Sequence, residues 1–131
     1  MKDFSWPVRV YYEDTDAGGV VFYANYLKFF ERARTEMLRS CGFEQDRLMA
    51  LDKLIFVVRS VSIDYLKPAR FNEQILVGAK IIEIKKTSLI FEQTITRQQD
   101  VLCNGKVRIA CLDAQSMKPT PIPIAILEQI T

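Results

Sequence analysis

The sequence predicts an α+β fold in which a long central helix is wrapped by a five-stranded antiparallel sheet. Two observations favour this architecture. One strand pattern and one long helical pattern open the chain, and four further strand patterns follow them, joined by short turns. A helix with several large apolar residues buries them well against the concave face of such a sheet. A length of 131 residues suits one domain, so we expect a single domain over residues 1–131.

The first strand and the long helix lie nearest the N-terminus. Trp6–Tyr12 is rich in residues that favour strands, and it ends at the acidic turn Glu13–Asp16. The helical pattern extends over about Ala24–Cys41, and Gly42 follows where a left-handed residue would end the helix. The apolar residues that recur at helical spacing are Leu27, Phe30, Ala33, Met37, Leu38 and Cys41. We expect a short second helix within Phe43–Lys53.

Four strand patterns fill most of the remaining chain. They cover Leu54–Tyr65, Gln74–Ile84, Ser88–Arg97 and Val101–Asp113. In the first of them, regular alternation places on one face Ile55, Val57, Val61, Ile63 and Tyr65. Three prolines then end the sheet, and Ile124–Ile130 is expected to form a short closing helix.

The turn between the last two strands could lie at either of two places. Asn104 and Gly105 form a strong hairpin signal, but a turn there would leave only short strands before it. We therefore expect the turn at Gln98–Asp100 and a β-bulge at Gly105.

Composition excludes several functional classes. Lys and Arg number 18 against 16 Asp and Glu, and a net charge of +2 argues against a nucleic-acid binder. The chain has no histidine, which excludes Ser-His-Asp and Cys-His catalysis and histidine-based zinc sites. Cys41, Cys103 and Cys111 are expected to be small buried hydrophobic residues, so no metal is expected. Because no long apolar run and no apolar secretion signal occur, we expect no membrane span and a cytoplasmic location.

The segment Glu13–Tyr26 combines carboxylates, Gly18, Gly19 and the expected helix start. One interpretation is a surface turn with solvated acids, followed by a capped helix. In the other interpretation, the glycines let a ligand approach the backbone. Free N–H groups at the helix start would then polarise a carbonyl group held beside a carboxylate. The residues alone leave both interpretations open.

This segment also carries a family resemblance, which extends along the whole chain. The strongest matches are Val8–Val21, Ala24–Tyr26 and Phe29–Glu36, and weaker ones follow at Phe56–Arg59, Tyr65, Pro68–Ala69, Thr87–Ser88, Cys111 and Met117–Pro119. On these residues the chain resembles the hot-dog-fold acyl-CoA thioesterases, in the branch that contains 4-hydroxybenzoyl-CoA thioesterase and the Tol–Pal-associated enzymes.

The resemblance implies a hot-dog fold and hydrolysis of acyl-CoA thioesters, with a short-chain or aromatic acyl group, to a free acid and coenzyme A. It implies no cofactor, because coenzyme A is part of the substrate, and it suggests lipid metabolism as the setting. The alternative is a non-catalytic module that binds acyl-CoA or acyl carrier protein.

By resemblance, Asp16 is the catalytic carboxylate, which either attacks the thioester carbonyl or activates water. The backbone N–H of Tyr23 would bind the developing oxyanion, as the second catalytic group. The Tol–Pal-associated branch commonly has histidine at this position, whereas the hydroxybenzoyl branch has tyrosine. Further substrate-binding positions are Gly19, Tyr26, Phe30, Glu31, Val58, Arg59, Lys85, Lys86, Thr87 and Ser88.

Several of these positions have a simpler interpretation. Glu31 could form an ion pair with Arg34 on the helix surface, and Tyr26 and Phe30 could serve only as core residues. The turn at Lys85 and Lys86, a candidate phosphate contact, could be an ordinary solvated turn. Arg59 would sit in a half-buried strand and would need an anionic partner.

Assembly follows from the open edges of the expected sheet. We expect at least a homodimer with a continuous sheet, and the resemblance implies a tetramer of two such dimers. It also places the site between subunits, so that basic groups of one subunit serve the Asp16 of its neighbour.

Overall fold

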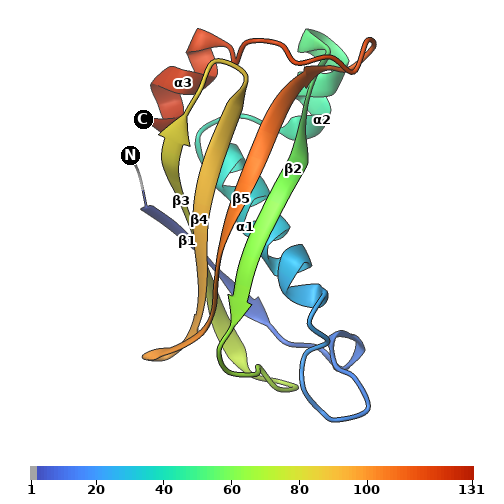
Figure 1. Ribbon diagram of the computed structural model, residues 1–131, viewed down its shortest axis with the longest axis vertical. Coiled ribbons are helices and arrows are strands. Elements are labelled where there is room, and N and C mark those ends of the chain that lie inside the picture. The colour runs from blue at the N-terminus through green and yellow to red at the C-terminus, as the bar shows by residue number, and fades with distance from the viewer. Residues whose placement is uncertain (1–2) are drawn as a thin grey trace.

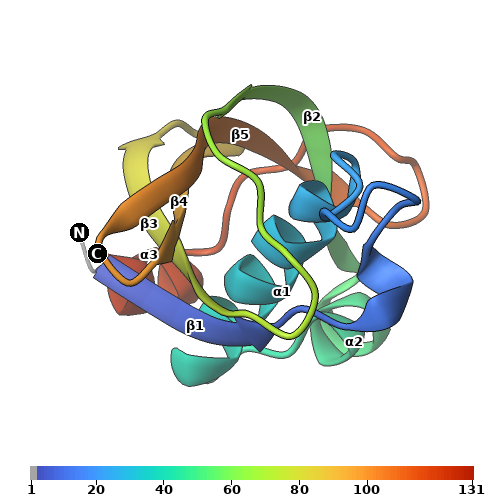
Figure 2. The ribbon, with the colours of Figure 1, turned by 90° about the horizontal axis from the view of Figure 1, so that it is seen from below.

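Figure 1 shows the computed structural model, which describes residues 3–131. Five strands form one antiparallel sheet in the order β1-β3-β4-β5-β2, so β1 and β2 are its edges. Their bounds are β1 (Asp3–Arg9), β2 (Leu54–Tyr65), β3 (Gln74–Ile84), β4 (Ser88–Arg97) and β5 (Asp100–Asp113). The sheet curves around α1 (Asn25–Ser40), as Figure 2 shows. The predicted α+β architecture is confirmed.

Helix α1 buries one face against the sheet and exposes the other. Its buried residues are Tyr26, Phe29, Phe30, Ala33, Arg34, Met37 and Leu38. The helix ends where the sequence predicts, because Gly42 adopts a positive φ of 92°. The N–H of Phe43 then donates to the carbonyl of Leu38 at 2.9 Å, which closes the last turn.

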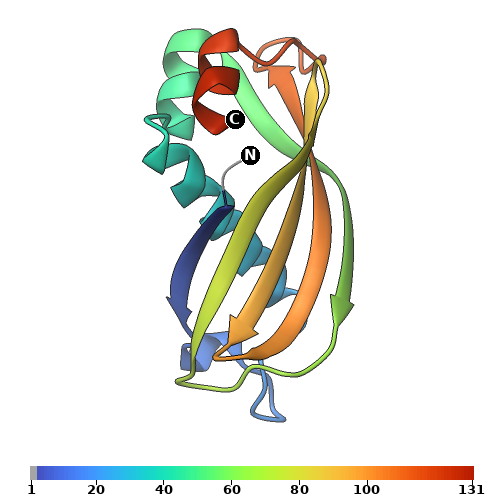
Figure 3. The ribbon, with the colours of Figure 1, turned by 90° about the vertical axis from the view of Figure 1, so that its left-hand side faces the viewer.

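Three short elements lie at one end of the sheet, away from the start of α1 (Figure 3). They are α2 (Gln45–Arg47), the π-helical turn η2 (Leu48–Asp52) and α3 (Ile124–Ile130). The predicted second helix and closing helix are therefore confirmed.

Strand β1 starts and ends earlier than predicted. It covers Asp3–Arg9 rather than Trp6–Tyr12, and Tyr12–Asp14 forms a 3-10 turn, η1. The cause is the side chain of Asp14, whose carboxylate accepts the backbone N–H of Tyr11 at 2.8 Å. That bond turns the chain where strand propensity alone would continue it.

The inward face of β2 differs from the prediction in its first half. The register of β2 against β5 shifts between Val58 and Ser60, so Arg59 occupies a β-bulge. Before the bulge, Leu54 lies in the core and Phe56 packs against it, whereas Ile55 and Val57 do not. Strict alternation therefore predicted the wrong face for Ile55 and Val57. The extra residue at Arg59 reverses which face the preceding side chains occupy.

Gly105 is not in a bulge, contrary to the prediction. It pairs in regular register with Ile63 of β2 and Gln93 of β4. A Cβ atom at Gly105 would lie 2.9 Å from the carbonyl oxygen of Ser62 and 3.0 Å from the ring of Phe30. Glycine is needed there because both the neighbouring strand β2 and the helix α1 approach closely. The predicted turn is confirmed, since β4 ends at Arg97 and β5 starts at Asp100.

The cysteines lie mostly inside. Cys103 and Cys111 are buried and Cys41 is half-buried. Burial raises the pKa of the Cys103 thiol to about 12, so this group is neutral at ordinary pH. Within residues 3–131, no helix is both long enough and apolar enough to cross a membrane.

Candidate active site

The loop between β1 and α1 is held in place mainly by Asp14. Its carboxylate caps η1, and its backbone carbonyl accepts the N–H of Phe22 at 3.0 Å and the side-chain amide of Asn25 at 2.8 Å. Asp14 is buried, and its carboxylate is hydrogen-bonded to the backbone rather than open to solvent. Asp14 therefore fixes the loop, and the exposed carboxylate that follows it is left to face solvent.

Asp16 is that exposed carboxylate. Its Oδ1 accepts the N–H of Gly18 at 2.8 Å, and its carbonyl accepts the N–H of Gly19 at 3.0 Å. Gly19 adopts a φ of 80°, and open space surrounds the position of a Cβ there. Asp16, Gly19 and the rings of Tyr12 and Phe71 line an open depression. A ligand can thus reach both the carboxylate and the backbone beside it.

The backbone between this loop and α1 presents two N–H groups. Among the residues that the structure describes, none accepts a hydrogen bond from the N–H of Tyr23 or of Ala24. These groups precede a helix of 16 residues, so their partial positive charge adds to that of the helix N-terminus. The Tyr23 side chain is exposed and lies against the ring of Phe22. The geometry suits stabilisation of an oxyanion by the backbone.

Tyr65, at the end of β2, fixes this backbone. Its hydroxyl group donates to the carbonyl of Tyr23 at 3.1 Å, and that carbonyl belongs to the same peptide unit as the N–H of Ala24. The ring of Tyr65 also contacts the rings of both Tyr23 and Tyr26. The end of β2 therefore lies beside the start of α1.

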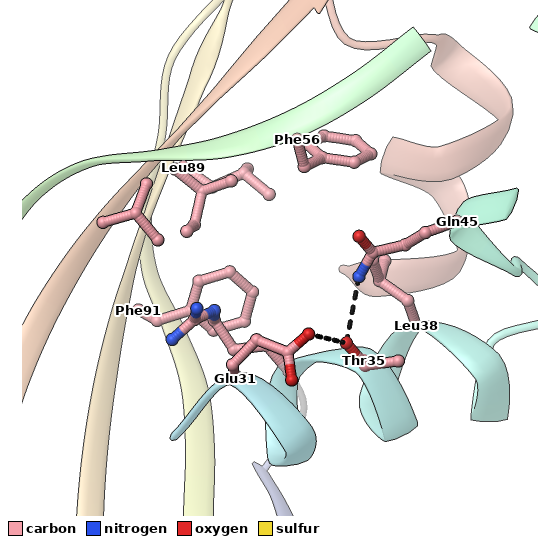
Figure 4. Close-up of a pocket in the computed structure, with 10 residues that line it drawn as sticks. Glu31, Thr35, Leu38, Gln45, Phe56, Leu89 and Phe91 are labelled. Atoms are coloured by element: carbon pink, nitrogen blue, oxygen red, sulfur yellow. Dashed lines mark hydrogen bonds between the residues drawn. The ribbon is translucent and has the colours of Figure 1, made fainter. Parts of the chain in front are cut away.

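A second site lies further along α1, where the helix faces β2, β4 and β5. It is a cavity of about 120 Å³ (Figure 4). Its apolar wall consists of Leu38, Phe56, Val58, Leu89, Phe91 and Ile109, and its polar wall consists of Glu31, Arg34, Thr35 and Gln45. Two residues predicted to bind substrate, Glu31 and Val58, thus line one cavity.

Arg34 is a residue of this cavity that the sequence did not single out. It is only 8% exposed and donates to the side-chain oxygen of Gln93 at 2.9 Å. The alternative interpretation of Glu31, an ion pair with Arg34, is wrong: Glu31 instead accepts the hydroxyl of Thr35 at 3.2 Å. The sequence does hold one indication of a buried polar pair: Gln93 is a polar residue on the inward face of β4, between Phe91 and Ile95.

The remaining predicted positions are dispersed. Tyr26 and Phe30 lie in the core, with Tyr26 accepting the N–H of Ala69 at 3.0 Å, so packing is observed and acyl contact stays a prediction. Arg59 is exposed at its bulge, not half-buried, and pairs with none of the described residues. In Figure 1 the turn between β3 and β4, which carries Lys85 and Lys86, lies at the opposite end of the sheet from the loop between β1 and α1, which carries Asp16.

That basic turn is only partly available to a ligand. Lys85 lies 3.7 Å from the carboxylate of Glu83, and Lys86 is exposed. The carbonyl of Thr87 accepts the N–H of Cys111 at 2.8 Å, and Ser88 is buried. Because this turn also lies at the far end of the sheet, it does not reach the Asp16 of its own chain.

A curved antiparallel sheet around one helix, with a carboxylate and free N–H groups at the helix start, defines a protein of the hot-dog class. A solved variant of 4-hydroxybenzoyl-CoA thioesterase, with 4-hydroxybenzoyl-CoA bound, has the same fold: the TM-score is 0.91 over 100% of both chains, at 14% identity. A probable thioesterase from Bartonella henselae matches with a TM-score of 0.89 and 35% identity, over 93% of this chain and 100% of that one.

Sequence comparison leads to the same class. Acyl-CoA thioesterase YbgC from Haemophilus influenzae is 48% identical over 92% of this chain and 88% of its own length. The family model of the thioesterase superfamily matches residues 18–104. The chain therefore belongs to the thioesterase superfamily, which confirms the predicted fold, family and enzyme class.

Proposed function

We propose that the protein hydrolyses acyl-CoA thioesters to a carboxylic acid and coenzyme A. The observation that carries this proposal is the pairing of an exposed carboxylate, Asp16, with the unpartnered N–H groups of Tyr23 and Ala24 at the start of α1. The name of the Haemophilus influenzae relative, an acyl-CoA thioesterase, supports it.

In this mechanism the thioester carbonyl oxygen faces the helix start. The N–H of Tyr23 stabilises the negative charge that develops on that oxygen, assisted by the N–H of Ala24. Asp16 either attacks the carbonyl carbon, or takes a proton from the water that attacks it. On both routes the thiolate of coenzyme A leaves and one water molecule is consumed. Because the donor is a backbone N–H group, tyrosine can replace histidine at position 23 without loss of the oxyanion contact.

We further propose that two copies pair through β2. This strand is a sheet edge, and it exposes Val58 by 50% and Val61 by 39%. An antiparallel β2–β2 pair places the end of one strand beside the start of the other. The start of α1 lies at the end of β2, through the bond between Tyr65 and Tyr23, whereas Phe56 and Val58 of the cavity lie near the start of β2. Pairing would therefore bring the Asp16 loop of one copy to the cavity of the other.

The same pairing gives the predicted basic positions a role. Arg59 lies on the pairing edge, and Lys86 is free to contact a phosphate of coenzyme A bound at a neighbouring subunit. A tetramer of two such dimers, a cytoplasmic location, a place in lipid metabolism and an acyl-carrier-protein partner are further parts of this proposal.

The direct test of the catalytic group is Asp16→Asn, with thiol release measured against a panel of short, long and aromatic acyl-CoAs. We expect kcat to fall by about 10²–10⁴-fold, the range for loss of a positioned acid–base group. Glu13→Gln removes an exposed carboxylate from the same loop and should leave kcat unchanged. Both variants should keep the oligomer size of the unsubstituted protein in light scattering. Full turnover by Asp16→Asn would overturn the assignment, and thioester binding without any turnover would favour the non-catalytic module.

A further inference from the structure

The cavity against α1 has the size and lining of a binding site for a small amphipathic group. Its volume of about 120 Å³ is close to the ~150 Å³ of an apolar cavity that accepts benzene. Figure 4 shows Phe56 and Leu89 on the sheet side, facing Glu31 and Thr35 on the helix side. One wall therefore suits a hydrocarbon group, and the other suits a polar end.

Arg34 brings a positive charge into this cavity without a negative partner. Among residues 3–131, no carboxylate forms an ion pair with its guanidinium group, and its one hydrogen bond goes to Gln93. Gln93 is neutral and fully buried, and its own amide donates to the carbonyls of Phe30 and Gly78. Burial lowers the pKa of Arg34, but arginine stays protonated in proteins, so the charge remains.

The uncommitted nitrogen atoms of Arg34 are not fully enclosed by the protein. Every fully buried side-chain nitrogen or oxygen in the described part of the chain has a hydrogen-bond partner. The guanidinium nitrogens that lack a partner must therefore keep some open contact, and Arg34 lines the cavity. These donors have the planar geometry that binds a carboxylate through two parallel hydrogen bonds.

Glu31 acts on Arg34 only through space and forms no ion pair with it. Its side chain is exposed and accepts the hydroxyl of Thr35, which in turn accepts the amide of Gln45 at 3.1 Å. This chain of hydrogen bonds holds Glu31 away from Arg34, although its charge still raises the pKa of Arg34. A buried cation without a hydrogen-bonded counter-ion is costly, which indicates that an anionic ligand completes the site.

We propose that this cavity binds the far end of an acyl group that carries its own carboxylate, and that Arg34 recognises that carboxylate. The ligand class is a chain of about six carbon atoms, or one ring, with a terminal carboxylate, which suits the cavity volume. As a statement about substrate, the inference rests on the proposed thioesterase function, because that function supplies the acyl group. As a statement about binding, it does not require turnover.

The binding test uses benzoate and benzyl alcohol, which share a ring and differ in charge. Titration calorimetry or NMR on the unsubstituted protein should show benzoate binding at least tenfold more tightly. In Arg34→Gln, which keeps a polar amide donor but removes the charge, that preference should disappear, and in Arg34→Lys it should return in part. Arg39→Gln is the matched control, because it removes an exposed arginine from the same helix. Equal binding of the two probes, or a benzoate preference that survives Arg34→Gln in a protein with an unchanged circular dichroism spectrum, would overturn the proposal.

The kinetic test compares adipyl-CoA, whose acyl group ends in a carboxylate, with hexanoyl-CoA of the same chain length. We expect kcat/KM to favour adipyl-CoA by about tenfold or more, and Arg34→Gln to reverse the order, mainly through KM for adipyl-CoA. If neither thioester is hydrolysed while benzoate still binds through Arg34, the proposed function fails and the binding site stands. If both thioesters are hydrolysed and hexanoyl-CoA is preferred, the proposed function stands and the assignment of the cavity to a carboxylate fails.

Discussion

The two candidate regions differ in the groups that they present to a ligand: the first relies largely on backbone groups, and the second relies on side chains. At the start of α1, the proposed catalytic groups are one exposed carboxylate, Asp16, and backbone N–H groups, with side chains such as Asp14 and Tyr65 holding the backbone in place. In the cavity, the working groups are side chains: Arg34 from α1 against an apolar wall of the sheet. In the proposed function the first region tolerates changes of side chain, as at position 23, whereas in the proposed binding site the ligand is selected through side-chain identity. The two proposals thus assign catalysis and selectivity to different regions of the subunit.

The largest expected difference between the regions is in stability. Phe30 is fully buried on α1, and its ring lies next to Gly105 of β5. Phe30→Ala should lower the free energy of unfolding by about 3–5 kcal/mol, because it leaves a large void in the core. Asp16→Asn should change it by less than about 0.5 kcal/mol, since the side chain is exposed. Urea unfolding measures the free energy of unfolding of both variants. Equal losses of stability in the two variants would contradict the expected difference between the regions.

A smaller effect is expected from the residue that holds the helix start. Tyr65→Phe removes one hydrogen bond, to the carbonyl of Tyr23, and keeps the aromatic contacts. Since such a bond contributes about 0.5–1.5 kcal/mol, kcat should fall by roughly 2–10-fold. KM should stay unchanged, because Tyr65 acts on the oxyanion donors rather than on the bound acyl group. A change in KM alone would assign Tyr65 to substrate binding instead.

The sequence predicted the first region better than the second. Asp16, the glycines and the start of α1 lie within a few residues of each other, so their proximity in space follows from their proximity in the sequence. Arg34 and Gln93 are 59 positions apart and meet only because β4 lies under α1. The bulge at Arg59 and the close approach at Gly105 likewise depend on how strands pair, which alternation patterns do not record.

In the proposed dimer, the two regions act together across a pair of copies. The most direct test is to co-express Asp16→Asn with Arg34→Gln and to measure adipyl-CoA hydrolysis by the mixed assembly. In a mixed dimer, one of the two sites would combine an intact Asp16 with an intact Arg34 from the other copy.

Random pairing should therefore restore about one quarter of the unsubstituted activity. The average of the two separately purified variants is the baseline, and it should be about fivefold lower if Arg34→Gln alone costs tenfold. Activity at about one quarter would support a site shared between copies. Activity no higher than the baseline would contradict it, because Asp16 and Arg34 would then serve the same site within a single chain.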